Sequence, residues 1–276
     1  MIPQAFITEW RADAPWAEDA QVEQDLIISR TLIEIFSSDE FREALGFRGG
    51  TALNKLHLDA PRRYSEDIDL VQLSPGTIGE IINPLQHRLE GLLGEGRVSI
   101  RERSARLLYR FDSELEPVVP LRLKIEIDTR DHEPVLGLVT REFEIRSGWF
   151  GGSAAVPTYP IDELMGTKLR ALYQRSKGRD LFDLALVLEE RLVDPDTVVR
   201  CFLAYLGKQG LSVSRAQFEE NLISKVEDRR FLADVHPLLR PEARFDSDEA
   251  GELVMRELIA RIPGDPWKGR FHPEGA

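Results

Sequence analysis

Apolar residues follow two different spacings along the chain, and each spacing predicts one kind of element. Helical spacing runs through residues 15–45 and again through 77–93. Elsewhere in the first half, apolar and polar residues alternate as they do in half-buried strands. The predicted strands are 47–48, 67–71, 98–102, 107–111, 121–128 and 143–145. Residues 52–58, shortly after the first predicted strand, have the propensity for a short helix.

The pattern becomes helical beyond Pro160 and remains so almost to the end. The predicted helices are 161–175, 179–190, 197–207, 215–226 and 249–260. Gly148 and the run Gly151-Gly152-Ser153 predict a linker before this region, and the tail 263–276 is expected to be loosely ordered. We therefore expect an α+β protein with an N-terminal domain at 1–150 and a helical domain at 151–276.

Composition narrows the class of protein. No stretch approaches the roughly 18 uninterrupted apolar residues of a membrane span, and the N-terminus lacks a basic segment followed by an apolar one. Cys201 is the single cysteine, which excludes an internal disulfide and a thiolate metal cluster. We expect a cytoplasmic protein with no membrane partner. A net charge of −12 means that a nucleic-acid partner would need a local positive surface.

Two aspartates carry the first chemical signal. Asp67 and Asp69 lie two residues apart on a predicted strand, so their carboxylates share one face. Adjacent carboxylates repel each other, and a divalent cation such as Mg²⁺ relieves that repulsion. The alternative is a solvated strand face.

A glycine pair precedes the short helix. Gly49 and Gly50 let the backbone approach a ligand closely, and the amide groups at the start of the helix suit a phosphate. The hydroxyl of Thr51 is placed either to contact that phosphate or to cap the helix. The alternative is a capped helix after a tight turn.

The predicted strand at 121–128 offers a third carboxylate. Lys124, Glu126 and Asp128 share one face. If this strand lies beside that of Asp69, either Glu126 or Asp128 completes a trio of acids. The alternative is a half-exposed strand with an internal Lys–Glu pair.

A cationic stripe is predicted in the helical region. If one helix continues through Gly178, then Lys168, Arg175, Arg179 and finally Asp183 lie on one face. Such a stripe suits a triphosphate, which arginine grips with two donors. A salt-bridged surface helix is the alternative.

Four blocks of sequence together resemble the AbiEii/AbiGii toxin family, a branch of the DNA polymerase β-like nucleotidyltransferase superfamily. The blocks are GGTALNKLHL at 49–58, RRYSEDIDLV at 62–71, LKIEI at 123–127 and ELMGTKLRALYQRSKGRDLFDLA at 163–185. The resemblance implies a nucleotidyltransferase-like mixed sheet with flanking helices, followed by a helical domain. It also implies a nucleoside triphosphate as substrate, Mg²⁺ or Mn²⁺ as cofactor, and a cognate antitoxin as partner.

The resemblance also assigns roles to matched positions. Asp67 and Asp69 would bind the metal, and the match at LKIEI favours Glu126 over Asp128 as the third ligand. Lys168 and Asp180 would belong to the catalytic or nucleotide-binding set. The other expected nucleotide-binding residues are Gly49, Gly50, Thr51, Arg175 and Arg179.

The acceptor stays open at this point. Some relatives resemble enzymes that extend tRNA, so we expect the 3′ end of tRNA or another RNA. Five arginines could form a positive surface for an RNA acceptor, and the first three would point to the same face of a strand. Alternatively, all five could do no more than balance the charge of nearby acids. These are Arg97, Arg101, Arg103, Arg106 and Arg110. The alternatives are a protein or small-molecule acceptor, or a catalytically inactive nucleotide-binding protein.

Overall fold

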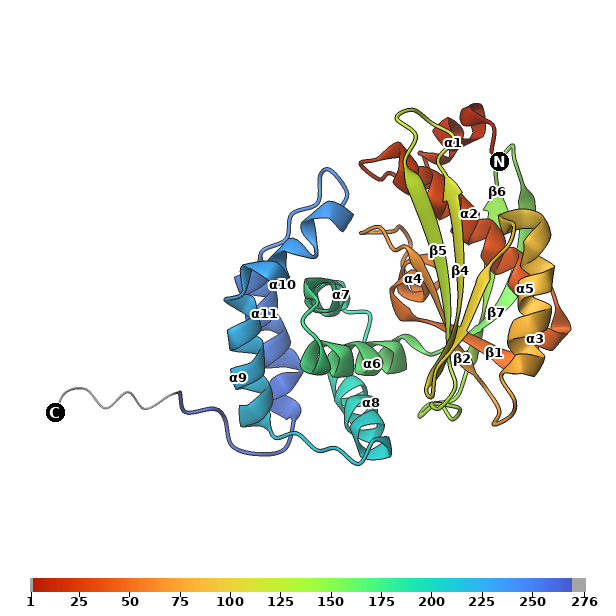
Figure 1. Cartoon of the computed structure of the whole chain (residues 1–276). Coiled ribbons are helices and arrows are strands. Elements are labelled where there is room, and N and C mark those ends of the chain that lie inside the picture. The colour runs from red at the N-terminus through yellow and green to blue at the C-terminus, as the bar shows by residue number, and fades with distance from the viewer. Residues whose placement is uncertain (1, 270–276) are drawn as a thin grey trace. The chain divides into compact units, whose positions relative to one another are not determined.

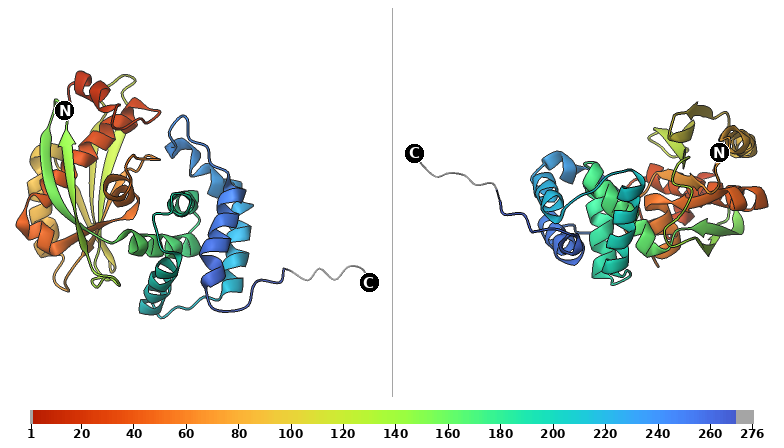
Figure 2. Two further views of the ribbon diagram at one scale, coloured as in Figure 1. Left: turned by 180° about the vertical axis from the view of Figure 1, so that it is seen from behind. Right: turned by 90° about the horizontal axis from the view of Figure 1, so that it is seen from below.

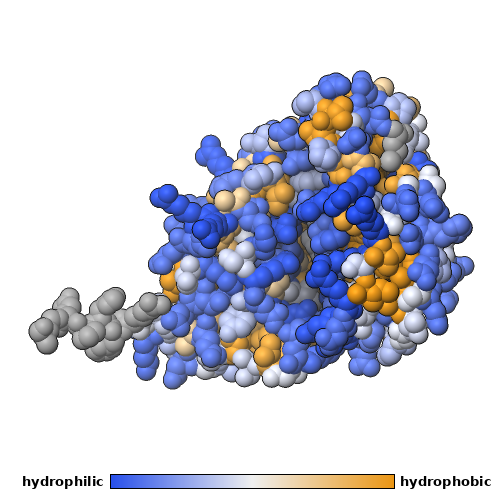
Figure 3. All heavy atoms as spheres, viewed as in Figure 1, coloured by the Kyte–Doolittle hydropathy of each residue, from blue (hydrophilic) through white to orange (hydrophobic). Residues whose placement is uncertain are grey.

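The chain forms two compact units. A computed structural model describes residues 2–269, and Figure 1 colours them along the chain. The first unit comprises the chain up to Pro160 together with Leu238–Ala243, and the second comprises Ile161–Pro237 and the residues from Arg244 onward. Figure 3 shows a mainly hydrophilic surface on which apolar residues form separate small groups.

The first unit is built on a seven-stranded mixed sheet in the order β3-β4-β5-β2-β1-β7-β6. Its strands are β1 Leu45–Arg48, β2 Asp67–Gln72, β3 Arg97–Ile100, β4 Ser104–Asp112, β5 Pro120–Asp128, β6 Val139–Arg146 and β7 Gly151–Thr158. The pairs β2–β5 and β1–β7 are parallel, and the other pairs are antiparallel. The expected mixed sheet and α+β class are therefore confirmed.

Helices cover one face of this sheet. They are α1 Gln4–Trp10, α2 Asp19–Phe36, α3 Asp39–Ala44 and α5 Gly79–Leu93. Figures 1 and 2 show α2 and α5 on the same side of the strands, where α2 packs on β5 and α5 on β4. Along β5, Leu123, Ile125 and Ile127 are fully buried towards these helices, and the residues between them are only partly buried. The other face of the sheet is thus left for polar side chains.

The predicted linker at 151–153 is wrong, because these residues begin strand β7. Their glycines and serine suggested a turn, but small side chains have another use here. A Cβ at Gly152 would lie 3.2 Å from Ile33 of α2 and 3.1 Å from the ring of Phe150. Glycine lets the helix pack closely on the strand, so tertiary packing outweighs the local preference.

The second unit contains helices α6 Ile161–Gln174, α7 Gly178–Glu189, α8 Pro195–Lys208, α9 Arg215–Val226, α10 Arg229–Ala233 and α11 Ser247–Glu257. Helix α6 packs on α8 and α7, while α11 packs on α7 and α9. Cys201 is buried within α8. The predicted loose tail lies partly outside the described residues. Among those described, no helix is both long and apolar enough to cross a membrane.

A short segment returns from the helical region to the first unit. The backbone N–H of Tyr64 donates a hydrogen bond to the carbonyl of Leu238 at 2.7 Å, and Arg63 forms an isolated β-bridge with Leu239. The segment Leu238–Ala243 therefore secures the stretch that leads into β2.

Candidate active site

The polar face of the sheet brings three carboxylates together. Asp67 and Asp69 lie on β2 opposite Lys124 and Glu126 of β5, respectively, in the parallel ladder. Neighbours in a ladder point to the same face, so Glu126 lies directly beside Asp69. Asp128 lies two pairs further along the ladder, opposite Val71, and forms an ion pair with Arg48 at 2.9 Å. The register therefore favours Glu126 as the third carboxylate.

Two cations bind these acids. The ammonium of Lys124 lies 2.9 Å from Asp67 Oδ2 and 3.3 Å from Glu126 Oε2. Arg106 donates hydrogen bonds of 2.9 and 2.7 Å from Nε and Nη2 to the other oxygen, Oε1. Burial alone would raise the pKa of Glu126, but Arg106 and Lys124 outweigh it, and the net pKa is lowered. Glu126 is thus held as a carboxylate.

Asp69 has the opposite electrostatic environment. Burial, the largest influence, raises its pKa, and Asp67 raises it further. Arg48 and Lys124 lower the pKa of Asp69 only in part. The carboxylate of Asp69 would therefore be stabilised by an additional cation.

The glycine pair leaves space for charged groups of the site. Gly49 has a φ of +85°, and a Cβ there would lie 2.3 Å from Asp69 Oδ2. At Gly50 a Cβ would lie 2.4 Å from Nη2 of Arg63. The backbone at the start of helix α4 (Gly49–Ala52) therefore runs directly against the carboxylate of Asp69, as a shared site for metal and phosphate requires.

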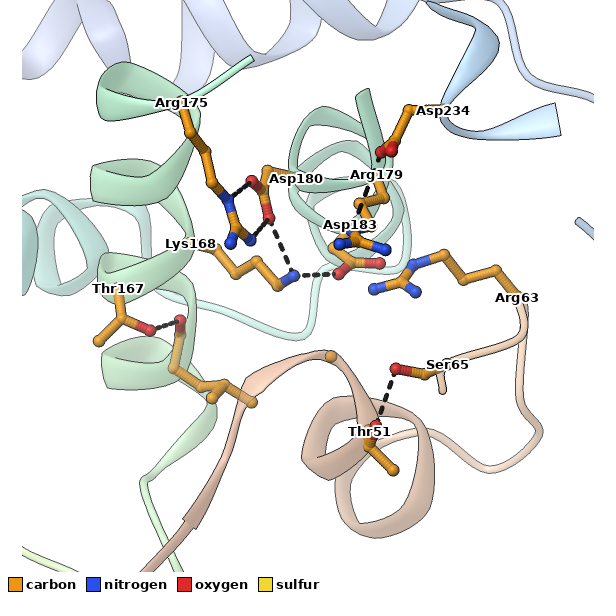
Figure 4. A network of polar contacts seen from close by, with 12 residues as sticks. Thr51, Arg63, Ser65, Thr167, Lys168, Arg175, Arg179, Asp180, Asp183 and Asp234 are labelled. Carbon is orange, nitrogen blue, oxygen red and sulfur yellow. Dashed lines mark hydrogen bonds and ion pairs between the residues drawn. The ribbon is translucent and has the colours of Figure 1, made fainter. Parts of the chain in front are cut away.

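The side chain of Thr51 does not cap the helix, so that alternative is wrong. Its hydroxyl donates to the carbonyl of Asp67 and lies 2.8 Å from the hydroxyl of Ser65 (Figure 4). These bonds fix the glycine turn to the first residue of β2. The chain continues as a π-helical turn, Leu53–His57, a form that often occurs at functional sites.

In the second unit, the buried side chains of Lys168, Asp180 and Asp183 form a charged cluster that the more exposed Arg175 joins from outside (Figure 4). The ammonium of Lys168 lies 3.1 Å from Asp180 Oδ1 and 2.7 Å from Asp183 Oδ2. Arg175 donates to both oxygens of Asp180, at 2.7 and 2.9 Å. Burial alone would raise the pKa of Asp180, but Lys168 and Arg175 outweigh it and hold that pKa well below its usual range.

The structure has two separate helices here, as predicted, so the condition for a single cationic stripe, one helix through Gly178, is not met. Helix α6 ends at Gln174 and α7 starts at Gly178, where a Cβ would lie 2.3 Å from the carbonyl oxygen of Phe231. The cationic groups therefore meet between two helices and not along one stripe. Arg179 points to another acid, Asp234, at 3.8 Å.

Sequence reasoning missed several contacts of the expected residues. Asp183 was placed on the cationic face without a role of its own, and the structure pairs it with Lys168. Arg106 was grouped with a possible acceptor surface, but it pairs with Glu126. Arg63 lies beside Gly50, and only the fold reveals that contact.

The acid pair fits a divalent ion, although no three acidic, histidine or cysteine side chains within the described residues form a complete ligand cage. Asp67 and Asp69 share a face, and the raised pKa of Asp69 marks a carboxylate that lacks sufficient positive charge. Mg²⁺ is commonly held by one or two carboxylates together with water and substrate phosphates. The residues present therefore suit such an ion.

Fold and site together define a nucleotidyltransferase. A family model described as nucleotidyl transferase AbiEii toxin, type IV toxin–antitoxin system, matches residues 30–251. The chain belongs to this family of nucleotidyltransferase toxins, and the resemblance found in the sequence is confirmed.

Two solved structures have a similar fold. MenT4, a nucleotidyltransferase toxin from Mycobacterium tuberculosis, aligns with a TM-score of 0.68 and 17% identity, over 95% of this chain and 91% of its own. JHP933 from Helicobacter pylori aligns with a TM-score of 0.56 and 19% identity, over 88% of this chain and 93% of its own. No curated protein matches the chain in sequence.

Proposed function

We propose that this protein is a Mg²⁺-dependent enzyme that transfers a nucleoside monophosphate from a nucleoside triphosphate to the 3′ end of an RNA, with tRNA as the first candidate. We further propose that it acts as a toxin neutralised by a cognate antitoxin. One observation carries the catalytic part: Gly49 brings the backbone of α4 against the carboxylate of Asp69. A phosphate-binding turn and an acid pair thereby become one site.

The site residues of the first unit have separate roles in this proposal. The backbone N–H groups of Gly50 and Thr51 would hold phosphate oxygens. Asp67 and Asp69, with Glu126 beside them, would hold the ion. When bound, Mg²⁺ neutralises phosphate charge and lowers the pKa of the attacking hydroxyl. That oxygen attacks the α-phosphorus, pyrophosphate leaves, and the hydroxyl proton passes to solvent.

Two cations of the sheet would orient the acids. Lys124 bridges Asp67 and Glu126, and Arg106 fixes Glu126 from the other side. Positioning of this kind and charge neutralisation supply most of the rate in phosphoryl chemistry.

For the second unit, we propose that Lys168, Arg175 and Arg179 are nucleotide-binding residues. Asp180 would act by positioning, because it accepts hydrogen bonds from both Lys168 and Arg175. A buried lysine held between acids has a defined direction, which is what selective recognition of a phosphate requires.

The test is to incubate the protein with Mg²⁺, each α-labelled nucleoside triphosphate in turn, and total cellular RNA. Asp69→Asn should abolish labelling and leave the fold intact, because it removes a carboxylate that burial already disfavours. Asp112→Asn, at the end of β4 and exposed, is the matched control and should retain activity.

The outcomes separate the candidate acceptors. Label in tRNA-sized RNA supports the proposal and identifies the nucleotide. A labelled protein band or small molecule instead would replace RNA as the acceptor. Nucleotide binding without pyrophosphate release would indicate an inactive binding protein. For the antitoxin, the measurement is growth arrest on expression, with and without the neighbouring gene.

A further inference from the structure

Two arginines face each other on the polar face of the sheet. Arg110 of β4 and Arg122 of β5 are directly opposite in the antiparallel ladder, and both are exposed. The Cβ atoms of such a pair lie about 4.5–5.5 Å apart, and like charges at that distance destabilise a sheet. An arrangement with this cost calls for an anion that compensates it.

The chain itself supplies no such anion among the described residues. Neither Arg110 nor Arg122 forms an ion pair there, whereas Lys124 and Arg106 on the same face both pair with Glu126. Asp112 is two residues beyond Arg110 on β4 but does not pair with it. In a protein with a net charge of −12, these two adjacent arginines form a local positive surface.

The sheet fixes where this surface lies relative to the acids. Rows of residues cross the strands: Asp69, Glu126 and Arg106 form one row. The next row contains Asp67, Lys124, Leu108 and Arg97. The row of Arg110 and Arg122 follows directly. Successive rows are about 6.6–6.8 Å apart along a strand, so the arginine pair lies one row from Asp67.

We infer that Arg110 and Arg122, with Arg97 at the edge strand, bind the phosphate backbone of the RNA acceptor next to its 3′ end. This inference rests on the proposed function. An acceptor hydroxyl that reaches Asp67 and Asp69 is joined to further phosphates within a few ångströms. The arginine row lies at that distance and on that face. An acidic partner protein could also use exposed arginines, but nothing would require it to meet them beside the acid pair.

The other arginines of the expected acceptor surface do not share this arrangement. Strand β3 ends at Ile100, so Arg101 and Arg103 lie in the turn that follows. Their predicted alignment with Arg97 on one strand face is therefore wrong. The surface consists of Arg97, Arg110 and Arg122.

The experiment compares Arg110→Ala/Arg122→Ala with the wild type at several salt concentrations. For the RNA, KM should rise about tenfold, as expected from the loss of two solvent-exposed contacts between arginine and phosphate. The slope of log affinity against log salt should become shallower by about 0.7 for each contact. KM for the triphosphate and kcat at saturating RNA should not change. Arg110→Lys/Arg122→Lys should restore much of the affinity.

A matched control removes two other arginines. Arg146, largely exposed on the far edge strand β6, and Arg200 of α8 are replaced by alanine together, which gives the same net charge. This variant should keep the wild-type KM for RNA. If the control variant raises the KM for RNA as much as the test variant does, the effect comes from overall charge and the inference fails.

Failure of this inference differs from failure of the proposed function. Unchanged KM and salt slope in Arg110→Ala/Arg122→Ala, with RNA still labelled, would overturn the surface alone. The surface would also be overturned if the double variant kept wild-type RNA kinetics but was no longer neutralised by the antitoxin. That result would assign the two arginines to the antitoxin. A wild-type enzyme that labels no RNA would overturn both.

Discussion

Replacement of Gly49 by alanine tests whether the contact between helix α4 and the acid pair is needed for catalysis. Gly49 has a φ of +85°, and a Cβ there would lie 2.3 Å from Oδ2, 3.0 Å from Cγ and 2.9 Å from Cβ of Asp69. The substitution therefore has two separate effects. It strains the backbone, and it displaces the carboxylate.

The first effect is a loss of stability, and the second is a loss of catalytic rate. An L-residue in the left-handed region costs about 1–2 kcal/mol, which lowers the melting temperature of a unit of this size by roughly 2–8 °C. A contact of 2.3 Å is far closer than real Cβ atoms adopt, so Asp69 has to move by roughly 1 Å. Misplacement by that distance lowers a catalytic rate by about 100-fold.

The assay measures kcat/KM for nucleotidyl transfer together with the melting temperature. Gly91→Ala is the matched control, because Gly91 lies in helix α5 with nothing within 4 Å of the added methyl group. It should retain full activity and equal or exceed wild-type stability. Wild-type activity in Gly49→Ala, despite the expected loss of stability, would refute the role assigned to the contact.

Three further predictions concern the second unit. Asp180→Asn should lower the free energy of unfolding by about 1–3 kcal/mol, because Lys168 and Arg175 lose a charged acceptor while Lys168 keeps its second buried partner, Asp183. Burial would raise the pKa of Asp180, but Lys168 and Arg175 outweigh it, so the wild type should lose stability as pH falls below about 4; denaturation curves of the variant should show a smaller loss over this range, and an equal loss would contradict the prediction. Gly166→Ala should lower the free energy of unfolding by about 1–3 kcal/mol, because the new Cβ would lie 2.5 Å from the Cβ of Cys201. The control Gly207→Ala, with open space around the added methyl group, should be neutral or stabilising. Equal melting temperatures of the two variants would contradict this prediction. Burial raises the pKa of the Cys201 thiol to about 11, so a disulfide reagent at pH 8 should modify it only after unfolding; rapid reaction of the native protein would contradict burial.

On strands β2 and β5, local periodicity was sufficient to determine which residues share a face. Alternation along 67–71 and 121–128 placed Asp67 with Asp69 and Lys124 with Glu126, as the structure shows. Helical spacing likewise identified the main helices of the second unit. These properties follow from the geometry of a single element, so neighbouring residues encode them.

The order and register of the strands were not encoded in that way. Only the fold places Glu126 beside Asp69 and Arg110 opposite Arg122, because pairing depends on residues far apart in the chain. Likewise, only the fold reveals that Gly178, at the start of α7, lies so close to the backbone of Phe231 that a Cβ would be 2.3 Å from its carbonyl oxygen. The sequence thus determined the chemical groups and their faces. Tertiary structure decided which groups meet, because non-local packing and pairing set their distances.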